Sequence, residues 1–490
     1  MHPRRTIRAF LVPLALTLSL LPGAGSTAAR PAAEPAAPAP DVTITVGTGN
    51  GPLLRDDFIG LSFEADVIAS PALTAGNLAQ YLRTLGPGVM RFGGNFVDKT
   101  FWTSRGETAP SWAVATLTPA DLERLNNLAT SSGWRVLLGV NLKHRDPARA
   151  ADEAAHAKRI LGDRLGGIQI GNEPNYYSGY SKAQLWADFQ AYRTAIQRAV
   201  PGLGVMGPET GRVTAAVGWL TDFAARQKAA GVSISALTTH YYPACAKSGT
   251  VTIGTLLSEG YRNGERARAQ LLADQAAGLG VPGLMDEANS VSCDGKDGVS
   301  DTFASALWAI DFEHLVAQTG VRGLYFHSAI ARCGGPKPLY KAYTPFCAPT
   351  DADARAGRLR AQPEYYGLLM LQQVGTGNFQ PVENTSTARV RAYALRRDGR
   401  LRMVLVNVQD PATSRPLIST VRLGGTYTQG NLVRLTGPGL AAKTGITLGG
   451  HVVGRDGTFA GTDKTPLAVN GTELTLSLPP GTATLVTLTP

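Results

Sequence analysis

Short apolar runs alternate with amphipathic stretches from about residue 58 to residue 375 of this chain. Eight of the runs are strand candidates, because they are short, rich in Val, Ile and Leu, and lack the strict polar alternation of a half-exposed sheet. They cover residues 58–63, 89–92, 136–140, 168–170, 204–207, 235–239, 283–285 and 323–326. A succession of eight strand–helix units predicts a (β/α)₈ barrel, an α/β fold.

The stretches between the strand candidates have recognisable helix ends. Thr118 is the expected N-cap of one helix, with Pro119 at its first position. Another helix is expected to start at Ser181, and a third covers about 301–319. The structural alternative is a doubly wound open sheet, but such sheets commonly carry a Gly-rich phosphate loop, and the sequence has none.

The pattern changes after about residue 375. Residues 388–408 are expected to form two strands joined by Asp398-Gly399, a dipeptide that favours a type I′ hairpin. Further strand candidates lie at 419–423, 451–453, 473–478 and 483–488, separated by Gly, Pro, Asn and Asp. We therefore expect a catalytic barrel at 58–375 and a C-terminal antiparallel β-sandwich domain at 376–490. The segment 41–57 contains an alternating strand at 42–46 that is expected to join this β-domain.

The first 28 residues have the pattern of a signal peptide. Three arginines precede an apolar run at 9–21, which gives way to small residues at 23–28. A membrane anchor is the alternative, but the run is short for a bilayer span and is flanked or broken by proline. Residues 29–40 then form an Ala/Pro linker. We expect a secreted protein without a membrane anchor.

The charge and the cysteines exclude some classes of function. The formal net charge is +10, and removal of the three signal arginines leaves +7. No zinc-finger spacing, basic helix or RNA-binding aromatic signature accompanies this charge, so nucleic acid is not an expected partner. Four cysteines in an exported chain predict two disulfides, with the pairing open: Cys245, Cys293, Cys333 and Cys347. Neither a metal site nor a cofactor is expected.

Two glutamates follow barrel strands at the points where each strand ends. Glu173 comes after the fourth strand, in Gly171-Asn172-Glu173-Pro174-Asn175, and Glu287 comes after the seventh, in Asp286-Glu287-Ala288-Asn289. Active sites of such barrels lie at this end of the strands. Glycoside cleavage needs one carboxyl to protonate the leaving oxygen and another to act as an anion. The pair therefore predicts a glycosidase, whereas the adjacent Asp286 is expected to point the other way and be structural.

The Asn-Glu-Pro motif with a second glutamate closing the seventh strand resembles the clan of retaining barrel glycosidases. By that resemblance Glu173 is the acid/base, Glu287 the nucleophile and Asn172 a ligand of the substrate 2-hydroxyl. His240-Tyr241-Tyr242, after the sixth strand, is similar to the clan's His-x-Tyr. The resemblance makes Tyr242 a support of the nucleophile and places His240 in the substrate site.

Finer motifs look like glycoside hydrolase family 79, the β-glucuronidase and heparanase group. The similar segments are Gly60-Leu61-Ser62-Phe63-Glu64, Arg91-Phe92-Gly93-Gly94-Asn95, Ser300-Asp301-Thr302-Phe303-Ala304 and Pro363-Glu364-Tyr365-Tyr366-Gly367. The resemblance extends over the barrel and the β-domain, and it implies that Glu64 and Asn95 contact sugar hydroxyls. It implies a carbohydrate partner, a β-glucuronide or acidic glycan.

One segment departs from that family. Where the family offers Tyr-Gly-Gly to the substrate carboxylate, this chain has Ser292-Cys293-Asp294-Gly295. An inward Asp294 would repel a uronate, so the carboxylate ligand would come from the loops after the sixth and eighth strands. The candidates there are Lys247, Arg332, Lys337, Lys341 and Tyr343.

The sequence thus predicts a secreted retaining β-glycosidase that acts on β-glucuronides or related uronic-acid glycans. Two alternatives stay open. The first is a retaining glycosidase of the same clan that acts on neutral sugars, as a glucosidase or xylanase does, which Asp294 favours. The second is a non-catalytic exported glycan-binding protein, which would have no need of two carboxylates so placed.

Overall fold

A computed structural model describes residues 39–335, 340–469 and 471–490. Eight parallel strands form a closed barrel in the order β10-β11-β12-β3-β4-β7-β8-β9, which confirms the predicted (β/α)₈ fold. In chain order the strands are β3 (Ile59–Glu64), β4 (Val89–Gly93), β7 (Arg135–Val140), β8 (Leu165–Ile170), β9 (Val205–Thr210), β10 (Ala236–Tyr241), β11 (Gly283–Ala288) and β12 (Gly323–His327). Each matches one of the eight predicted runs.

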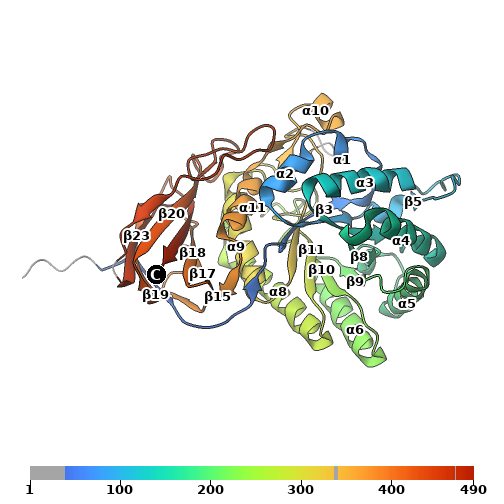
Figure 1. Cartoon of the computed structure of the whole chain (residues 1–490), viewed down its shortest axis with the longest axis horizontal. Coiled ribbons are helices and arrows are strands. Elements are labelled where there is room, and N and C mark those ends of the chain that lie inside the picture. The colour runs from blue at the N-terminus through green and yellow to red at the C-terminus, as the bar shows by residue number, and fades with distance from the viewer. Residues whose placement is uncertain (1–38, 336–339, 470) are drawn as a thin grey trace, which may run out of the picture. The chain divides into compact units, whose positions relative to one another are not determined.

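A helix follows each barrel strand and covers the outside of the barrel (Figure 1). In the same order they are α2 (Leu78–Leu85), α3 (Pro119–Ser132), α4 (Pro147–Leu161), α5 (Lys182–Ala199), α6 (Thr214–Ala230), α8 (Glu259–Leu279), α9 (Phe303–Gln318) and α11 (Pro363–Val374). The expected N-caps are present, since Thr118 and Ser181 each form a capping box at the start of α3 and α5. Short helices α1 (Ala72–Ala75), α7 (Ile253–Leu256) and α10 (Asp351–Arg355) lie in loops.

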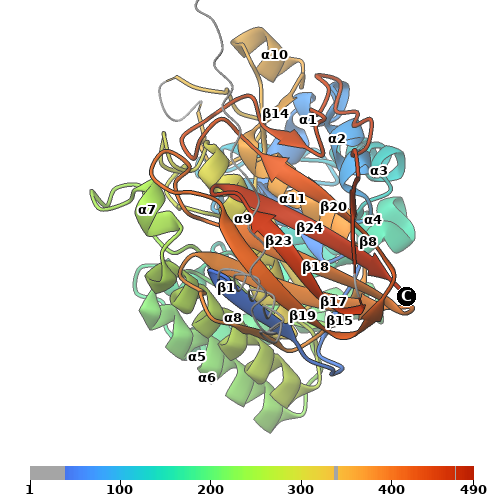
Figure 2. The same cartoon turned by 90° about the vertical axis from the view of Figure 1, so that its left-hand side faces the viewer.

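The C-terminal part contains two sheets that enclose a second apolar core (Figure 2). One has the order β16-β1-β19-β23 and the other β2-β15-β17-β18-β24-β20-β21, with β22 beside β20. The first consists of β16 (Val382–Asn384), β1 (Val42–Val46), β19 (Leu417–Tyr427) and β23 (Gly471–Leu478). The second consists of β2 (Leu53–Leu54), β15 (Gly377–Phe379), β17 (Val390–Arg397), β18 (Arg400–Asn407), β24 (Thr482–Thr489), β20 (Gln429–Thr436), β21 (Thr447–Leu448) and β22 (Thr465–Leu467).

The β-domain differs from the sequence expectation in several places, which include the short strands β15, β16, β21 and β22 that were not expected. The β1 strand pairs in parallel with β19, so the four-stranded sheet is not antiparallel throughout. The expected strand at 451–453 is wrong: His451 makes one isolated bridge to Leu448, because a turn through Gly449 and Gly450 comes directly before it. The strand β20 was not expected. The hairpin prediction is confirmed, since Asp398 and Gly399 both have positive φ between β17 and β18.

Helices α9 and α11 lie between the barrel and the β-domain. Helix α9 is buried on every side, which explains why its sequence is apolar all round rather than amphipathic. Its Asp311 accepts a hydrogen bond from Tyr393 of β17 at 2.5 Å and pairs with Arg262 of α8 at 2.9 Å. The buried polar contacts join the two parts of the chain alongside the apolar core.

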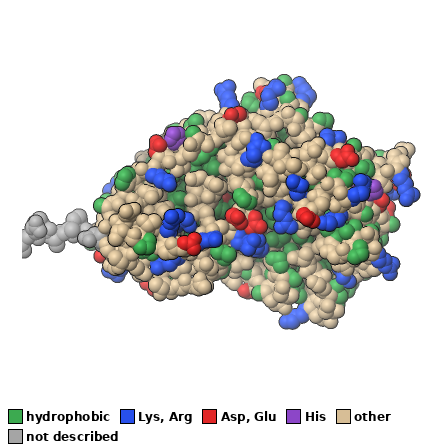
Figure 3. All heavy atoms as spheres, viewed as in Figure 1, with side chains coloured by type: hydrophobic (Ala, Val, Ile, Leu, Met, Phe, Trp, Pro, Cys, Tyr) green, Lys and Arg blue, Asp and Glu red, His purple; other side chains and the backbone are tan. Residues whose placement is uncertain are grey.

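The predicted signal peptide (1–28) and nearly all of the linker (29–40) lie outside the described residues. Among the residues that are described, no helix has the length and apolar character needed to cross a membrane. On the face shown in Figure 3, Lys and Arg side chains are dispersed and interspersed with Asp and Glu. The positive net charge therefore does not form one continuous basic surface on that face.

Candidate active site

A cavity of about 300 Å³ opens at the carboxyl ends of the barrel strands. Glu64, Asn95, Glu173, Tyr242 and Glu287 all line it, and they come from five different strands or the loops that directly follow them. The other lining residues are Tyr176, Arg212, Ser292, Cys293, Asp294, His327, Lys341 and Tyr343. The structure thus brings together residues up to 279 positions apart in the chain. Five of the seven predicted site residues line the cavity, and Asn172 and His240 lie beneath it.

Glu173 projects from a strained backbone position directly after β8. Its φ of 46° and ψ of 52° lie in the left-handed region, which costs a non-glycine residue about 1–2 kcal/mol. The Glu173 amide donates to the carbonyl of Glu209 at 2.8 Å, which holds this conformation. Its carboxylate lies 3.1 Å from Nδ1 of His240, and its side chain is 14% exposed. The strand end therefore directs the carboxyl group into the cavity.

Glu287 lies inside β11 rather than after it, because that strand continues to Ala288. Arg91 Nη1 donates to its Oε2 at 2.7 Å, and the Tyr242 hydroxyl donates to its Oε1 at 3.0 Å. Burial raises the pKa of Glu287, but the charges of His327, His240 and Arg91 outweigh this effect and hold the pKa well below its usual value. Glu287 is therefore an anion with both oxygens hydrogen-bonded.

One carboxylate oxygen of Glu173 lies within 4.8 Å of one of Glu287. Retaining glycosidases have carboxyl groups about 5–5.5 Å apart, whereas inverting enzymes need about 6.5–9.5 Å to admit a water molecule. The separation in this cavity is shorter than the range that inverting enzymes need.

Arg91 is a fully buried cation at the centre of the site. Its Nε donates to Gln169 at 2.9 Å, and Nη1 contacts Ser62 at 3.1 Å besides Glu287. Its Nη2 donates to Asn172 at 2.9 Å and to Glu209 at 3.0 Å. The five N–H groups of a guanidinium are thus all directed to partners, and the side chain fixes groups on β3, β8, β9 and β11 relative to one another.

His240 is fully buried on β10 and contacts both glutamates rather than open space. Burial lowers its pKa, but the charge of Glu287 and the hydrogen bonds to Glu173 and Glu209 raise it to about 10. The imidazole is therefore protonated at neutral pH. His240 does not line the cavity, and its contacts there are with the two glutamates.

Two further carboxyl groups lie below Glu173 and Glu287. Glu209 of β9 accepts hydrogen bonds from Arg91 and from the Thr238 hydroxyl, at 2.7 Å for the latter. Burial raises its pKa, but the hydrogen bond from His240 and the charge of Arg91 outweigh this and leave the pKa below its ordinary value. Asp286 accepts from the Gln169 amide, and burial together with the Glu209 charge raises the pKa of Asp286 well above normal. Asp286 is thus a buried group of the barrel interior.

Three predicted sugar ligands have clear surroundings. Glu64 accepts from the Phe96 amide at 2.8 Å and lies 3.6 Å from His327. Asn95 lines the same side of the cavity, on the loop after β4. Asn172 accepts from Arg91, and its buried Nδ2 has no hydrogen-bond partner among the described residues. Asn172 itself does not line the cavity.

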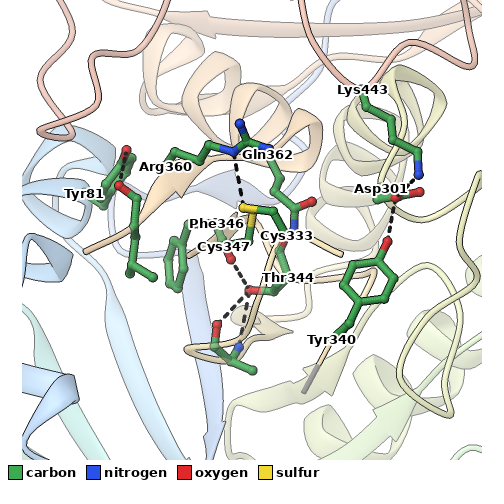
Figure 4. The surroundings of a disulfide bond; sticks show 12 residues. Tyr81, Asp301, Cys333, Tyr340, Thr344, Phe346, Cys347, Arg360, Gln362 and Lys443 are labelled. Carbon is green, nitrogen blue, oxygen red and sulfur yellow. Dashed lines mark hydrogen bonds and ion pairs between the residues drawn. A yellow bond between two sulfur atoms is a disulfide. The ribbon is translucent and has the colours of Figure 1, made fainter. Parts of the chain in front are cut away.

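Two disulfides close the loops around the cavity, and they settle the pairing that the sequence left open. Cys245–Cys293 joins the loop after β10 to the loop after β11, and Cys333–Cys347 closes the loop after β12. Figure 4 shows the second bond with the Arg360 guanidinium beside it, 3.2 Å from the Cys333 sulfur. In the same view Tyr340 reaches Asp301, which also pairs with Lys443 of the β-domain at 2.6 Å. These bonds hold the eighth-strand loop at the rim.

The loop that departs from the family pattern forms one wall of the cavity. Asp294 lines it with φ of 67°, and Lys341 lies 3.8 Å from the Asp294 carboxylate. Of the five predicted carboxylate ligands, Lys341 and Tyr343 line the cavity, whereas Lys247 and Arg332 do not. Lys337 is outside the described residues. Arg212, from the loop after β9, adds a second cation.

Among the residues that the structure describes, two sets of side chains are close enough together to hold a metal ion: Glu173, His240 and Glu287, and Glu209, His240 and Asp286. Arg91 lies between the sets and already donates to Glu287 and Glu209. A further cation would meet the repulsion of this buried guanidinium and of the protonated His240. The donor set therefore suits hydrogen bonding better than metal ligation.

Sequence reasoning assigned no role to Arg91, Glu209 or His327. His327 and Glu209 are polar residues at the ends of predicted strands, so the rule that found Glu173 and Glu287 also applies to them. Arg91 carries a different signal, a charged residue in the middle of the apolar run 89–92. Such a residue needs buried partners, and here they are the site's own groups.

No known protein-family profile matches the chain, and no curated protein matches its sequence. Solved structures do match its fold. The 4-O-α-L-rhamnosyl-β-D-glucuronidase of Fusarium oxysporum 12S, in its Rha-GlcA complex, aligns with a TM-score of 0.74 at 19% identity over 91% of this chain and 100% of that one. The chain has the fold of the barrel glycoside hydrolases.

Two more of these structures come from Xanthomonas axonopodis pv. citri. A GH51 arabinofuranosidase has a TM-score of 0.65 at 15% identity and covers 92% of this chain and 100% of its own. A GH39 enzyme has a TM-score of 0.60 at 16% identity, with 92% and 98% covered. At these identities the similarity establishes the fold, and the chemistry must be argued from the site itself.

Proposed function

We propose that this protein is a secreted retaining β-glycosidase that hydrolyses β-glucuronides or related uronic-acid glycans. The observation that carries the proposal is the pair Glu173 and Glu287, which face one cavity with carboxylate oxygens within 4.8 Å of each other. The two groups differ in their surroundings as the reaction requires: Glu287 is an anion held by Arg91 and Tyr242, whereas Glu173 is more exposed and contacts His240.

The reaction would proceed in two displacements. Glu287 attacks the anomeric carbon while the glycosidic C–O bond breaks, and Glu173 gives its proton to the leaving oxygen. Glu173, now a carboxylate, then takes a proton from water, whose oxygen displaces Glu287 from the anomeric carbon and restores both groups. Asn172, whose buried Nδ2 has no partner among the described residues, is assigned to the 2-hydroxyl, and Glu64 and Asn95, which line the cavity, to other hydroxyls. Residues 58–375 carry this chemistry, with no cofactor.

The uronate preference rests on two observations. The aligned enzyme from Fusarium oxysporum is a β-D-glucuronidase by its description. The cavity also contains the cations Lys341 and Arg212 and the Tyr343 hydroxyl, which together can bind a carboxylate. The pairing of Lys341 with Asp294 at 3.8 Å offsets part of the repulsion that Asp294 would exert.

Hydrolysis of a neutral β-glycoside is the second candidate, and Asp294 is the observation that favours it. Its carboxylate lines the cavity, and it competes with a uronate for Lys341. The aligned structures include an enzyme described as a bifunctional glucanase-xylanase, with a TM-score of 0.60.

Secretion is proposed from the leader sequence and from the two disulfides, because such bonds persist in oxidising compartments.

Hydrolysis of aryl β-glucuronide, β-glucoside, β-xyloside and β-galactoside by the mature protein separates the candidates. We expect glucuronide cleavage with an initial product of retained configuration, observed by NMR. Glu287→Gln should lower kcat by at least about 10³-fold, because the nucleophile and not a binding group is lost. Cleavage of a neutral glycoside alone would contradict the uronate assignment, and an unchanged rate in Glu287→Gln would contradict the catalytic assignment.

A further inference from the structure

A second cavity, of about 250 Å³, lies between helix α4 and the segment that includes β5 (Thr100–Trp102) and β6 (Ala115–Leu117). No residue lines both this cavity and the one that contains Glu173 and Glu287. The α4 side consists of Asp146, Arg149, Ala150 and Glu153, which recur at helical spacing and share one face. The opposite side consists of Phe101, Trp102, Pro110 and Trp112.

Glu153 is a buried carboxyl group without a protein partner. The residue is 6% exposed and lines the cavity, and no hydrogen bond or ion pair to the carboxyl exists within the described part of the chain. Burial is the main reason that the pKa of Glu153 is raised to about 8. A buried polar group is normally hydrogen-bonded, and leaving one unpaired costs about 1–3 kcal/mol. A ligand with hydroxyl groups in the cavity would supply the missing partners.

The Arg149 side chain of the wall is already paired. Arg149 donates to Asp146 at 3.1 Å and to the Trp102 carbonyl at 2.8 Å. Its guanidinium covers the Phe101 ring at 4.4 Å, and the His144 ring covers Trp112 with the ring centroids 3.7 Å apart. A cationic ligand would therefore meet the Arg149 charge and would find these ring faces occupied. An uncharged ligand with apolar C–H surface and hydroxyl groups matches the walls.

We propose that this cavity is a second sugar-binding site, which holds one uncharged sugar ring with the Glu153 carboxyl as its hydrogen-bonding group. The choice of a sugar among hydroxylated ligands rests on the proposed glycoside hydrolase function. The cavity lies beyond the carboxyl end of β7, since Asn141, directly after Val140, lines it. It therefore opens at the same end of the barrel as the catalytic cavity and suits a sugar remote from the bond that is cleaved.

Binding is measured in the Glu287→Gln background, so that no probe is hydrolysed. The probes are methyl β-D-glucopyranoside, methyl β-D-galactopyranoside and methyl β-D-xylopyranoside, each titrated by calorimetry, with benzylamine as the cationic alternative. Glu153→Leu removes the hydrogen-bonding group, and Trp112→Ala removes part of the opposite wall. Glu123→Leu is the matched control, because Glu123 is an exposed glutamate on the neighbouring helix α3.

We expect at least one sugar to bind, and Glu153→Leu and Trp112→Ala to weaken it about tenfold or more while Glu123→Leu leaves it unchanged. Glu153→Leu should not lower Tm, because a leucine replaces an unpaired buried carboxyl; weaker binding in a stable protein excludes a merely structural role. Equal affinity in Glu153→Leu and Glu123→Leu, binding of benzylamine instead of sugars, or no sugar binding would overturn the proposal. Glu153-dependent binding without hydrolysis of any glycoside by the wild-type protein would instead overturn the proposed function.

Discussion

Removal of the Tyr242 hydroxyl tests how much this one group contributes to the orientation of Glu287. The hydroxyl donates to Glu287 Oε1 at 3.0 Å, and burial raises the pKa of Tyr242 well above 10, so it stays a donor at every working pH. Tyr242→Phe keeps the ring in place beside Tyr343 and deletes this one bond. A hydrogen bond to a charged group is worth about 1.5–3 kcal/mol, so kcat should fall by about 10- to 100-fold.

The same change predicts the direction of a pH effect. The pKa of Glu287 is depressed, so its active anion is present above that pKa and is lost as the pH falls through it. Loss of a donor to the anion raises this pKa by about 1–2 units, since one unit corresponds to about 1.4 kcal/mol. The acid limb of kcat/KM for an aryl β-glucuronide should therefore move to higher pH by that amount.

Tyr241→Phe is the control, because Tyr241 is the preceding residue and its ring packs against Arg268 and Phe312 rather than in the cavity. It should leave the rate and the pH profile unchanged. An acid limb that stays in place in Tyr242→Phe, or a kcat equal to that of the wild type, would show that the bond does not stabilise the Glu287 anion.

Three further predictions test other parts of the argument. Glu173→Gln should slow hydrolysis of a phenyl β-glucuronide by about 10²–10⁴-fold and of a 2,4-dinitrophenyl β-glucuronide far less, because the better leaving group needs no proton in the first step; equal losses would contradict the acid role. Asp294→Asn should raise kcat/KM for the aryl glucuronide several-fold and leave that for the glucoside unchanged. It removes a negative charge that repels the glucuronide carboxylate and competes with it for Lys341. Glu265 is buried, which raises its pKa from 4.5 to about 8 although Trp308 donates to it, so its contribution to stability is full below pH 4.5 and is lost as the pH rises through 8. Between pH 4.5 and 9 the free energy of unfolding of the wild type, measured by urea titration, should therefore fall by up to about 5 kcal/mol more than that of Glu265→Gln. Equal losses in the two proteins would contradict the assignment.

The barrel could be predicted because its strands carry two independent signals, apolar β-branched runs and the helices between them. The strand ends were less accessible to sequence reasoning. Strand β11 was expected to end at Met285, since Asp286 and Glu287 are charged, yet the strand continues through both. Gln169 and Arg91 supply their partners inside the barrel, and those contacts join strands far apart in the sequence. A local pattern does not contain this information.

The candidate site was predictable where a single strand is enough to place a residue. Glu64, Asn95, Glu173 and Glu287 all follow from the position of a polar residue at the end of a buried strand, and all line the cavity. Whether a residue at that level faces the cavity or lies beneath it depends on the tilt and register of neighbouring strands. That is why His240 was expected in the substrate site, whereas it is fully buried and does not line the cavity.

The buried charges around Glu287 bear on the proposed second step. Arg91 and the protonated His240 carry positive charges, and Glu287 and Glu209 carry negative ones. When Glu287 becomes an ester in the covalent intermediate, this fully buried set gains one net positive charge. Glu173 lies next to this set, because its carboxylate is 3.1 Å from His240. In the proposed second step the Glu173 carboxylate accepts the proton from the attacking water. His240 therefore contacts both carboxyl groups of the proposed reaction, Glu173 at 3.1 Å and Glu287 at 3.9 Å.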